Sequence, residues 1–120
     1  MLQLQAKVKM KFILGANMEL KEMQKKVYEN KLKHGFNTTN VEREFCFLEG
    51  ELSEAFEAYI KKHDNLGEEL ADTAIYLLGL SEMLGIDLQE EVEKKMKINE
   101  NREYVMVNGV LVKKGSKDDI

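Results

Sequence analysis

Four segments of this chain repeat apolar side chains at the spacing of an α-helix, and no proline interrupts any of them. Proline removes a backbone donor and breaks helices, so its absence from 120 residues favours long helices. Short polar or glycine-containing stretches separate the segments, and Asn40 and Asp87 are placed to cap the helices that follow them. The expected helices cover about 18–33, 41–62, 65–84 and 88–102.

Two further segments have the pattern of β-strands. Residues 2–12 alternate apolar and polar side chains, which is typical of a half-buried strand. Residues 104–113 are two β-rich runs around Asn108-Gly109, the pair preferred in a type I′ hairpin turn. A two-stranded hairpin is marginal alone in water, so we expect it to pack on the helices or on another subunit. The predicted fold is all-α, a four-helix bundle with a short N-terminal strand and a C-terminal β-hairpin.

Length and composition limit the function classes. The 120 residues suit one domain, 1–120, with a helical core at about 18–103 and the hairpin at about 104–113. The net charge of −4 gives no basic footprint for nucleic acid. No apolar run approaches a membrane span, the first residues do not form a signal peptide, and the single Cys46 fits a reducing compartment. We therefore expect a cytoplasmic protein with no nucleic-acid or membrane partner.

Two pairs of acidic residues fall within apolar faces of neighbouring helices. On helical wheels, Glu51 lies between Ala58 and Leu48. Glu54 sits at the border of the same apolar arc, Glu69 falls between Tyr76 and Leu80, and Asp72 lies beside Met83 and Gly79. Charge is then absent from Thr73 to Ser81. The acids with no such surroundings are expected to be solvated or peripheral: Glu42, Glu44, Glu57 and Glu68.

An unpaired carboxylate in an apolar setting is costly, and two acids at i and i+3 repel each other. A hard cation such as Mg²⁺, or Mn²⁺, compensates such a cluster. The alternative is that these acids form salt bridges with the many lysines. Glu-x-x-His pairs typical of di-iron bundles are absent, because Lys31 and Ile60 precede the only histidines, His34 and His63, by three residues.

The fourth predicted helix carries a polar face. Lys95, Asn99 and Arg102 share this face at i, i+4 and i+7, where an apolar stripe would continue. Lysine and arginine suit phosphate oxygens, and asparagine offers both a donor and an acceptor. The alternative is that these long side chains reach to solvent from a half-exposed helix end. Beside a carboxylate cluster that holds a cation, they describe a site for a polyphosphate ester.

These segments, in this order, resemble the MazG-like all-α nucleotide pyrophosphohydrolases over about residues 18–104. The matching stretches are GELSEAFEAY (50–59), GEELADTAIYLLGLSEMLGIDL (67–88) and KMKINENR (95–102). The family motif E-x-x-E, a spacer and E-x-x-D corresponds to Glu51-x-x-Glu54, fourteen residues, and Glu69-x-x-Asp72. Lys95, Asn99 and Arg102 correspond to the closing K-x-x-x-N-x-x-R. The chain is most similar to the short dCTP pyrophosphatase-like members.

The resemblance implies Mg²⁺-dependent hydrolysis of a (d)NTP to the monophosphate and pyrophosphate, as in house-cleaning of nucleotide pools. It implies that Glu51, Glu54, Glu69 and Asp72 are the catalytic metal ligands, that Lys95, Asn99 and Arg102 bind the substrate, and that the protein is a homodimer or homotetramer. The chain departs from the family pattern at Gly50 and in having no tryptophan to stack a base. Phe36, Phe47 and Tyr76 are substitutes, with His34 a further pocket candidate. The alternatives are a non-catalytic helical oligomer or binding module, and a related hydrolase of a phosphoribosyl-nucleotide pyrophosphate.

Overall fold

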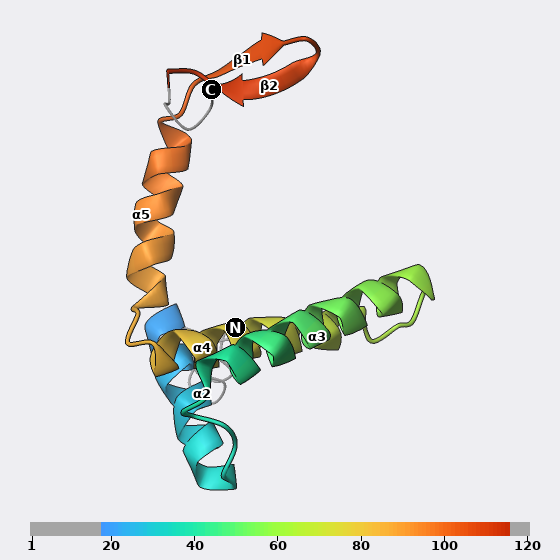
Figure 1. Cartoon of the computed structure of the whole chain (residues 1–120), viewed down its shortest axis with the longest axis vertical. Helices are drawn as coiled ribbons and strands as arrows, with labels where there is room; N and C mark the ends of the chain where they lie inside the picture. The colour runs from blue at the N-terminus through green and yellow to red at the C-terminus, as the bar shows by residue number, and fades with distance from the viewer. Residues whose placement is uncertain (1–17, 116–120) are drawn as a thin grey trace, which may run out of the picture. The chain divides into compact units, whose positions relative to one another are not determined.

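The structure is a computed structural model that describes residues 18–115, and the predicted strand at 2–12 lies outside them. Within this range the chain forms four helices followed by one hairpin, as Figure 1 shows. The elements are α2 (Leu20–His34), α3 (Val41–Ile60), α4 (Leu66–Met83), α5 (Leu88–Glu100), β1 (Tyr104–Val107) and β2 (Val110–Lys113). Each predicted helix is present, with ends within about two residues of those expected. The all-α class of MazG type with a C-terminal hairpin is therefore confirmed.

Compact packing divides the chain after Gln89 into two units. The first unit contains α2, α3 and α4, and the second contains most of α5 and the hairpin. In the first unit, α3 and α4 lie side by side and α2 packs against α4 (Figure 1). Residues 61–65 join α3 to α4, and such a short connection makes consecutive helices antiparallel neighbours. The expectation of a single domain stays a prediction.

Local side chains fix the turn between α2 and α3. Gly35 ends α2 with φ 72°, in the left-handed region where glycine carries no steric penalty. The backbone N–H of Phe36 then donates to the carbonyl of Lys31. Asn40 caps α3, because its Oδ1 accepts from the backbone N–H of Arg43 at 3.0 Å, as the sequence predicts. The Asn37 side chain is bonded to the backbone of Asn40 in both directions.

The core that residues 18–89 form is small. The buried apolar residues in this range are Ala55, Ala58, Leu78 and Leu80, all on α3 and α4. At Gly79, a Cβ atom would stand 3.2 Å from Lys31 Cδ and 3.4 Å from Val27 Cγ1, so glycine permits the close approach of α2. The described helices include none that is both long and apolar enough to cross a membrane.

The predicted apolar face of α3 is only partly buried. Among the stripe residues, Phe45, Leu52 and Tyr59 are 46%, 57% and 65% exposed. In the apolar stretch 74–84 of α4, the buried residues are likewise limited to 78–81. The reason is geometric: α3 has one neighbouring helix along its length in the described unit, and one neighbour covers a narrow line of side chains.

The hairpin of the second unit has the predicted turn. β1 and β2 pair antiparallel with Val107 opposite Val110. Asn108 and Gly109 have φ of 50° and 79°, as a type I′ turn requires. Both strands are largely exposed on both faces within this unit. The expected packing of the hairpin on the helices or on another subunit stays a prediction.

We expect Gly109→Val to open this hairpin, because a β-branched residue at positive φ costs roughly 1–2 kcal/mol against a marginal element. Amide hydrogen exchange of β1 and β2 should accelerate while the helices keep their protection. Val110→Thr, a neighbouring exposed β-branched position, is the control and should leave exchange unchanged. Equal protection in the valine variant would contradict the turn assignment.

Candidate metal and nucleotide site

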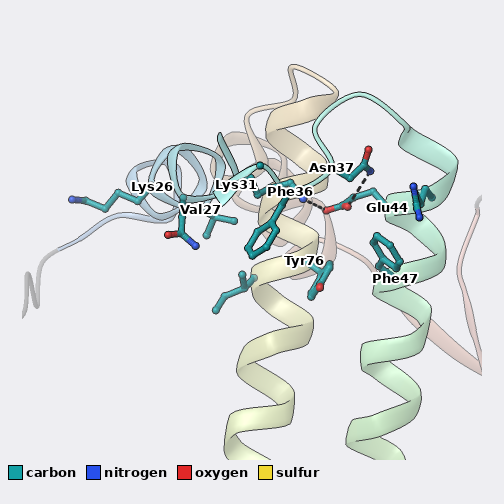
Figure 2. Close-up of a pocket in the computed structure, with 12 residues that line it drawn as sticks. Lys26, Val27, Lys31, Phe36, Asn37, Glu44, Phe47 and Tyr76 are labelled. Carbon is teal, nitrogen blue, oxygen red and sulfur yellow. Dashed lines mark hydrogen bonds and ion pairs between the residues drawn. The ribbon is translucent and has the colours of Figure 1, made fainter. Parts of the chain in front are cut away.

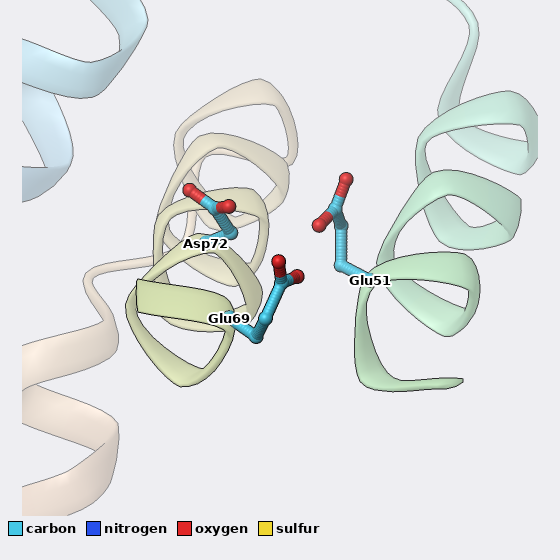
Figure 3. A group of neighbouring side chains, drawn as sticks. All are labelled: Glu51, Glu69 and Asp72. Carbon is cyan, nitrogen blue, oxygen red and sulfur yellow. The ribbon is translucent and has the colours of Figure 1, made fainter. Parts of the chain in front are cut away.

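Three of the four predicted acids come together between α3 and α4. Glu51, Glu69 and Asp72 each place a carboxylate oxygen within 4.8 Å of the others (Figure 3). Glu51 extends from α3, and the other two extend from α4, with Glu69 directed toward Glu51. Glu51 and Glu69 are half-buried, whereas Asp72 is exposed. Acids at i and i+3 on one helix share a face, so antiparallel packing is enough to add the third.

The position of Glu69 is fixed by its own helix. Asn65 Nδ2 donates to Glu69 Oε1 at 3.2 Å, and the Thr73 hydroxyl donates to the Glu69 carbonyl at 3.0 Å. Glu69 Oε2 is buried, and no donor among residues 18–115 reaches it. A buried carboxylate oxygen without a donor is costly. This oxygen is a ready ligand for a cation.

The carboxylates of the cluster carry negative charge that no described cation neutralises. Burial, followed by the charges of Glu54 and Asp72, raises the pKa of Glu51. Burial and the same two charges, in that order, raise the pKa of Glu69. Within the described residues, no lysine, arginine or histidine forms an ion pair with any of these acids. The alternative of structural salt bridges therefore finds no support at this cluster in the described part of the chain.

Glu54 occupies a different position from the other three predicted acids. It is exposed and lies outside the group whose oxygens meet within 4.8 Å. Its carboxyl is nevertheless close enough to raise the pKa of both Glu51 and Glu69. Glu54 thus borders the cluster, and its role as a metal ligand stays a prediction.

A groove of about 760 Å³ lies in the first unit between the end of α2 and the facing sides of α3 and α4 (Figure 2). Its walls include Phe36, Phe47 and Tyr76, the three aromatic residues that the sequence offers as base-stacking candidates. The Phe47 and Tyr76 rings meet edge to face at 6.2 Å. His34 is exposed and stacks on Phe36 at 5.5 Å. The fold therefore brings the predicted aromatic residues into one place.

The groove adjoins the acid cluster. Phe47 precedes Glu51 by one helical turn on α3, and Tyr76 follows Asp72 by one turn on the antiparallel α4. The pKa of Tyr76 is raised by burial and then by the charge of Glu51. On both helices, the lining of the groove therefore ends about one helical turn from the carboxylates.

Sequence reasoning missed a buried ion pair in the wall of this groove. Glu44 has no exposed surface, and its Oε2 accepts from the ammonium group of Lys31, which is 7% exposed. The expectation that Glu44 is solvated is wrong, because the α2 crossing covers it. Glu44 lies seven residues before Glu51 on the same face of α3, but the residues that bury it come from α2 and the following loop, which this periodicity does not show. The other three acids expected to be solvated, Glu42, Glu57 and Glu68, are exposed.

The predicted phosphate-binding residues belong to the second unit. Lys95 and Asn99 lie on α5 and are exposed, and the half-buried Arg102 follows the helix. Their role toward a substrate stays a prediction.

The raised pKa values predict how pH affects the metal-free protein. Glu51 and Glu69 have a higher pKa in the folded state than in the unfolded state. At a pH above their ordinary pKa of 4.5, the protein therefore takes up protons when it folds. Their contribution to stability therefore falls as pH rises from about 4.5 through the raised pKa values. We expect the urea midpoint in EDTA to rise as pH is lowered from about 8 toward 5, and this trend to weaken in Glu51→Gln/Glu69→Gln. Glu42→Gln is the control on α3, and an identical slope in all three proteins would refute the coupling.

The first unit is thus a helical scaffold that holds a carboxylate cluster beside an aromatic groove. A model of the MazG-like family matches residues 37–117, more than half of the chain, so the chain belongs to the MazG-like family. No curated protein and no solved structure matches it. Membership suggests a nucleotide pyrophosphohydrolase-type function, and the family generally uses divalent metals. The match is to the family as a whole, and the closer resemblance to dCTP pyrophosphatase-like members stays a prediction.

Proposed function

We propose that this protein is a Mg²⁺-dependent pyrophosphohydrolase that converts a (d)NTP to the monophosphate and pyrophosphate. Its role would be house-cleaning, the removal of unwanted nucleotides from the cellular pool. The observation that carries the proposal is the cluster of Glu51, Glu69 and Asp72 beside the aromatic groove. Family membership supports the same reaction class. The groove offers stacking surfaces for a base, and the cluster offers ligands for the cation that accompanies a triphosphate.

The residues at the cluster fit Mg²⁺. The possible ligands are carboxylate oxygens, which a hard cation prefers. One of them is Glu69 Oε2, which accepts no hydrogen bond from residues 18–115. Glu51, Glu69 and Asp72 would hold the ion, with Glu54 as a neighbouring fourth acid. When bound, Mg²⁺ neutralises phosphate charge and lowers the pKa of water. Mn²⁺ satisfies the same oxygen ligands.

The chain's own residues have separate tasks in this reaction. Phe36, Phe47 or Tyr76 holds the base, so that the phosphates extend toward the acids one helical turn away. A carboxylate of the cluster orients the attacking water toward the α-phosphorus and accepts its proton. Lys95, Asn99 and Arg102 are proposed to bind phosphate oxygens and balance the charge of the leaving pyrophosphate.

The experiment is to incubate the purified protein with a panel of canonical and damaged (d)NTPs, with and without Mg²⁺, and to measure pyrophosphate and phosphate separately. Mg²⁺-dependent pyrophosphate without phosphate is the expected result. Phosphate alone would overturn the assignment of the cleaved bond. Release of pyrophosphate only from a phosphoribosyl-nucleotide would favour the related hydrolase. No release from any substrate, together with no effect of Mg²⁺ on stability, would favour the non-catalytic oligomer.

We also propose that the protein works as a homodimer or homotetramer. Large apolar side chains remain exposed near the meeting ends of α3 and α4, including Phe56, Tyr59, Ile60 and Leu70. A second copy of the chain is the partner that the family resemblance implies for such a surface. Light scattering during gel filtration gives the subunit number, and a monomer at micromolar concentration would overturn this proposal.

A further inference from the structure

The buried ion pair in the groove wall has no role in the proposed reaction. Glu44 accepts from Lys31 through Oε2 and from Asn37 Nδ2 through Oε1 at 3.2 Å (Figure 2). All three residues line the groove. Burying a charge pair is expensive, so the pair is poor evidence for a purely stabilising role.

Hydrogen-bonding capacity singles out Lys31 within this group. A lysine ammonium has three N–H donors and no acceptor, and Glu44 takes one of them. Both oxygens of Glu44 accept bonds, and the amide of Asn37 is bonded to Glu44 and to the backbone of Asn40. Lys31 therefore retains donors for a molecule in the groove. Its ammonium lies 6.0 Å from the centre of the Tyr76 ring, beside the surface on which a base would stack.

Charge balance decides which kind of acceptor suits these donors. The carboxylate of Glu44 neutralises the ammonium, so the pair has no net charge to attract a phosphate. A phosphate on Lys31 would also approach Glu44 closely and be repelled by it. A neutral carbonyl oxygen accepts from the ammonium without this repulsion. In the proposed function, the phosphates bind at the acid cluster, one helical turn away.

We propose that Lys31, held in place by Glu44, selects nucleotides whose base carries a carbonyl oxygen where adenine and cytosine carry an amino group. The favoured bases are therefore uracil, thymine, guanine and hypoxanthine. An amino group at that position presents a donor to a donor, and neither hydrogen bond forms. This inference rests on the proposed function, since it names the substrate class of that site.

The test uses two pairs of nucleosides, and the members of each pair differ at one exocyclic group of the base. Inosine and adenosine form one pair, and uridine and cytidine form the other. Binding of the free nucleosides to the full chain is measured by calorimetry without metal, and kcat/KM is measured for the four triphosphates with Mg²⁺. In each pair that binds, we expect the nucleoside or triphosphate with the carbonyl group to have at least about tenfold higher affinity or kcat/KM than the one with the amino group. This is the scale of one well-oriented hydrogen bond. Equal binding, or preference for the amino member in both pairs, would overturn the inference.

The matched variant removes the pair without leaving a lone buried charge. In Lys31→Met/Glu44→Leu, the preference should fall below about threefold, because methionine donates nothing to a carbonyl oxygen. Lys33→Met removes an exposed charge from the same helix and should keep the wild-type preference. A uniform loss of affinity for all triphosphates in the double variant would assign Lys31 to phosphate and overturn the inference.

The two measurements separate this inference from the proposed function. Hydrolysis without a carbonyl preference would overturn the role of Lys31 and leave the hydrolase intact. Selective nucleoside binding without pyrophosphate release would overturn the hydrolase and leave the recognition by Lys31. Circular dichroism of each variant confirms that a lost preference is not a lost fold.

Discussion

Asp72→Asn is expected to lower Mg²⁺-dependent pyrophosphate release by at least about 100-fold, the scale of removing one group that stabilises transition-state charge. Asparagine keeps the size of the side chain and removes one anionic ligand from the cluster of Glu51, Glu69 and Asp72. The decisive measurement is kcat/KM over a Mg²⁺ titration, which separates weaker metal binding from slower chemistry. Turnover equal to that of the wild type would remove Asp72 from the site.

The control for this variant lies on the same helix. Glu68→Gln makes the same change of charge at an exposed residue outside the cluster and should keep near-wild-type activity. Metal-free Asp72→Asn should unfold at the same or a higher urea concentration than the wild type, because it loses a repulsive charge that raises the pKa of both neighbours. A lower midpoint would show that Asp72 is structural.

Lys31→Met is expected to cost the folded chain about 3–5 kcal/mol, the range for breaking a buried ion pair on one side. The substitution leaves Glu44 with no exposed surface and one remaining donor, Asn37. Urea unfolding followed by circular dichroism measures the loss. Lys31→Met/Glu44→Leu should recover most of it, because a buried pair replaced by apolar residues is often neutral in stability.

Two results limit the interpretation of these variants. Lys33→Met, on the exposed side of α2, should change stability by less than about 0.5 kcal/mol. A double variant as unstable as Lys31→Met alone would mean that the loss comes from packing of the lysine stem against Gly79. In that case the ion pair itself contributes little.

Local signals explain why the helix bounds could be predicted from the sequence. Gly35 and Asn40 act through their own backbone neighbourhood, and the structure places the end of α2 and the start of α3 at them. The meeting of Glu51, Glu69 and Asp72 follows from periodicity and one short connection. Glu54 lies at the border of the apolar arc, and periodicity alone does not say whether it joins the three acids.

Burial that depends on a distant segment could not be predicted in the same way. Glu44 is buried because Lys31 crosses to it from α2 and Asn37 reaches it from the loop, and neither contact is visible in the periodicity of α3. The same periodicity marked Phe45, Leu52 and Tyr59 as core, yet the chain supplies no described neighbour to cover them. A helical wheel shows which apolar side chains form one face, and it does not show which segment packs against that face.

The small core has a thermodynamic consequence. Among residues 18–89, the fully buried apolar side chains are Ala55, Ala58, Leu78 and Leu80, so this described part of a single chain gains little free energy from apolar burial. If a second copy covers the exposed rings of α3, folding and association become one equilibrium governed by mass action. Dilution would then act on this protein as heat or urea does, and its cellular abundance would set the fraction that is folded.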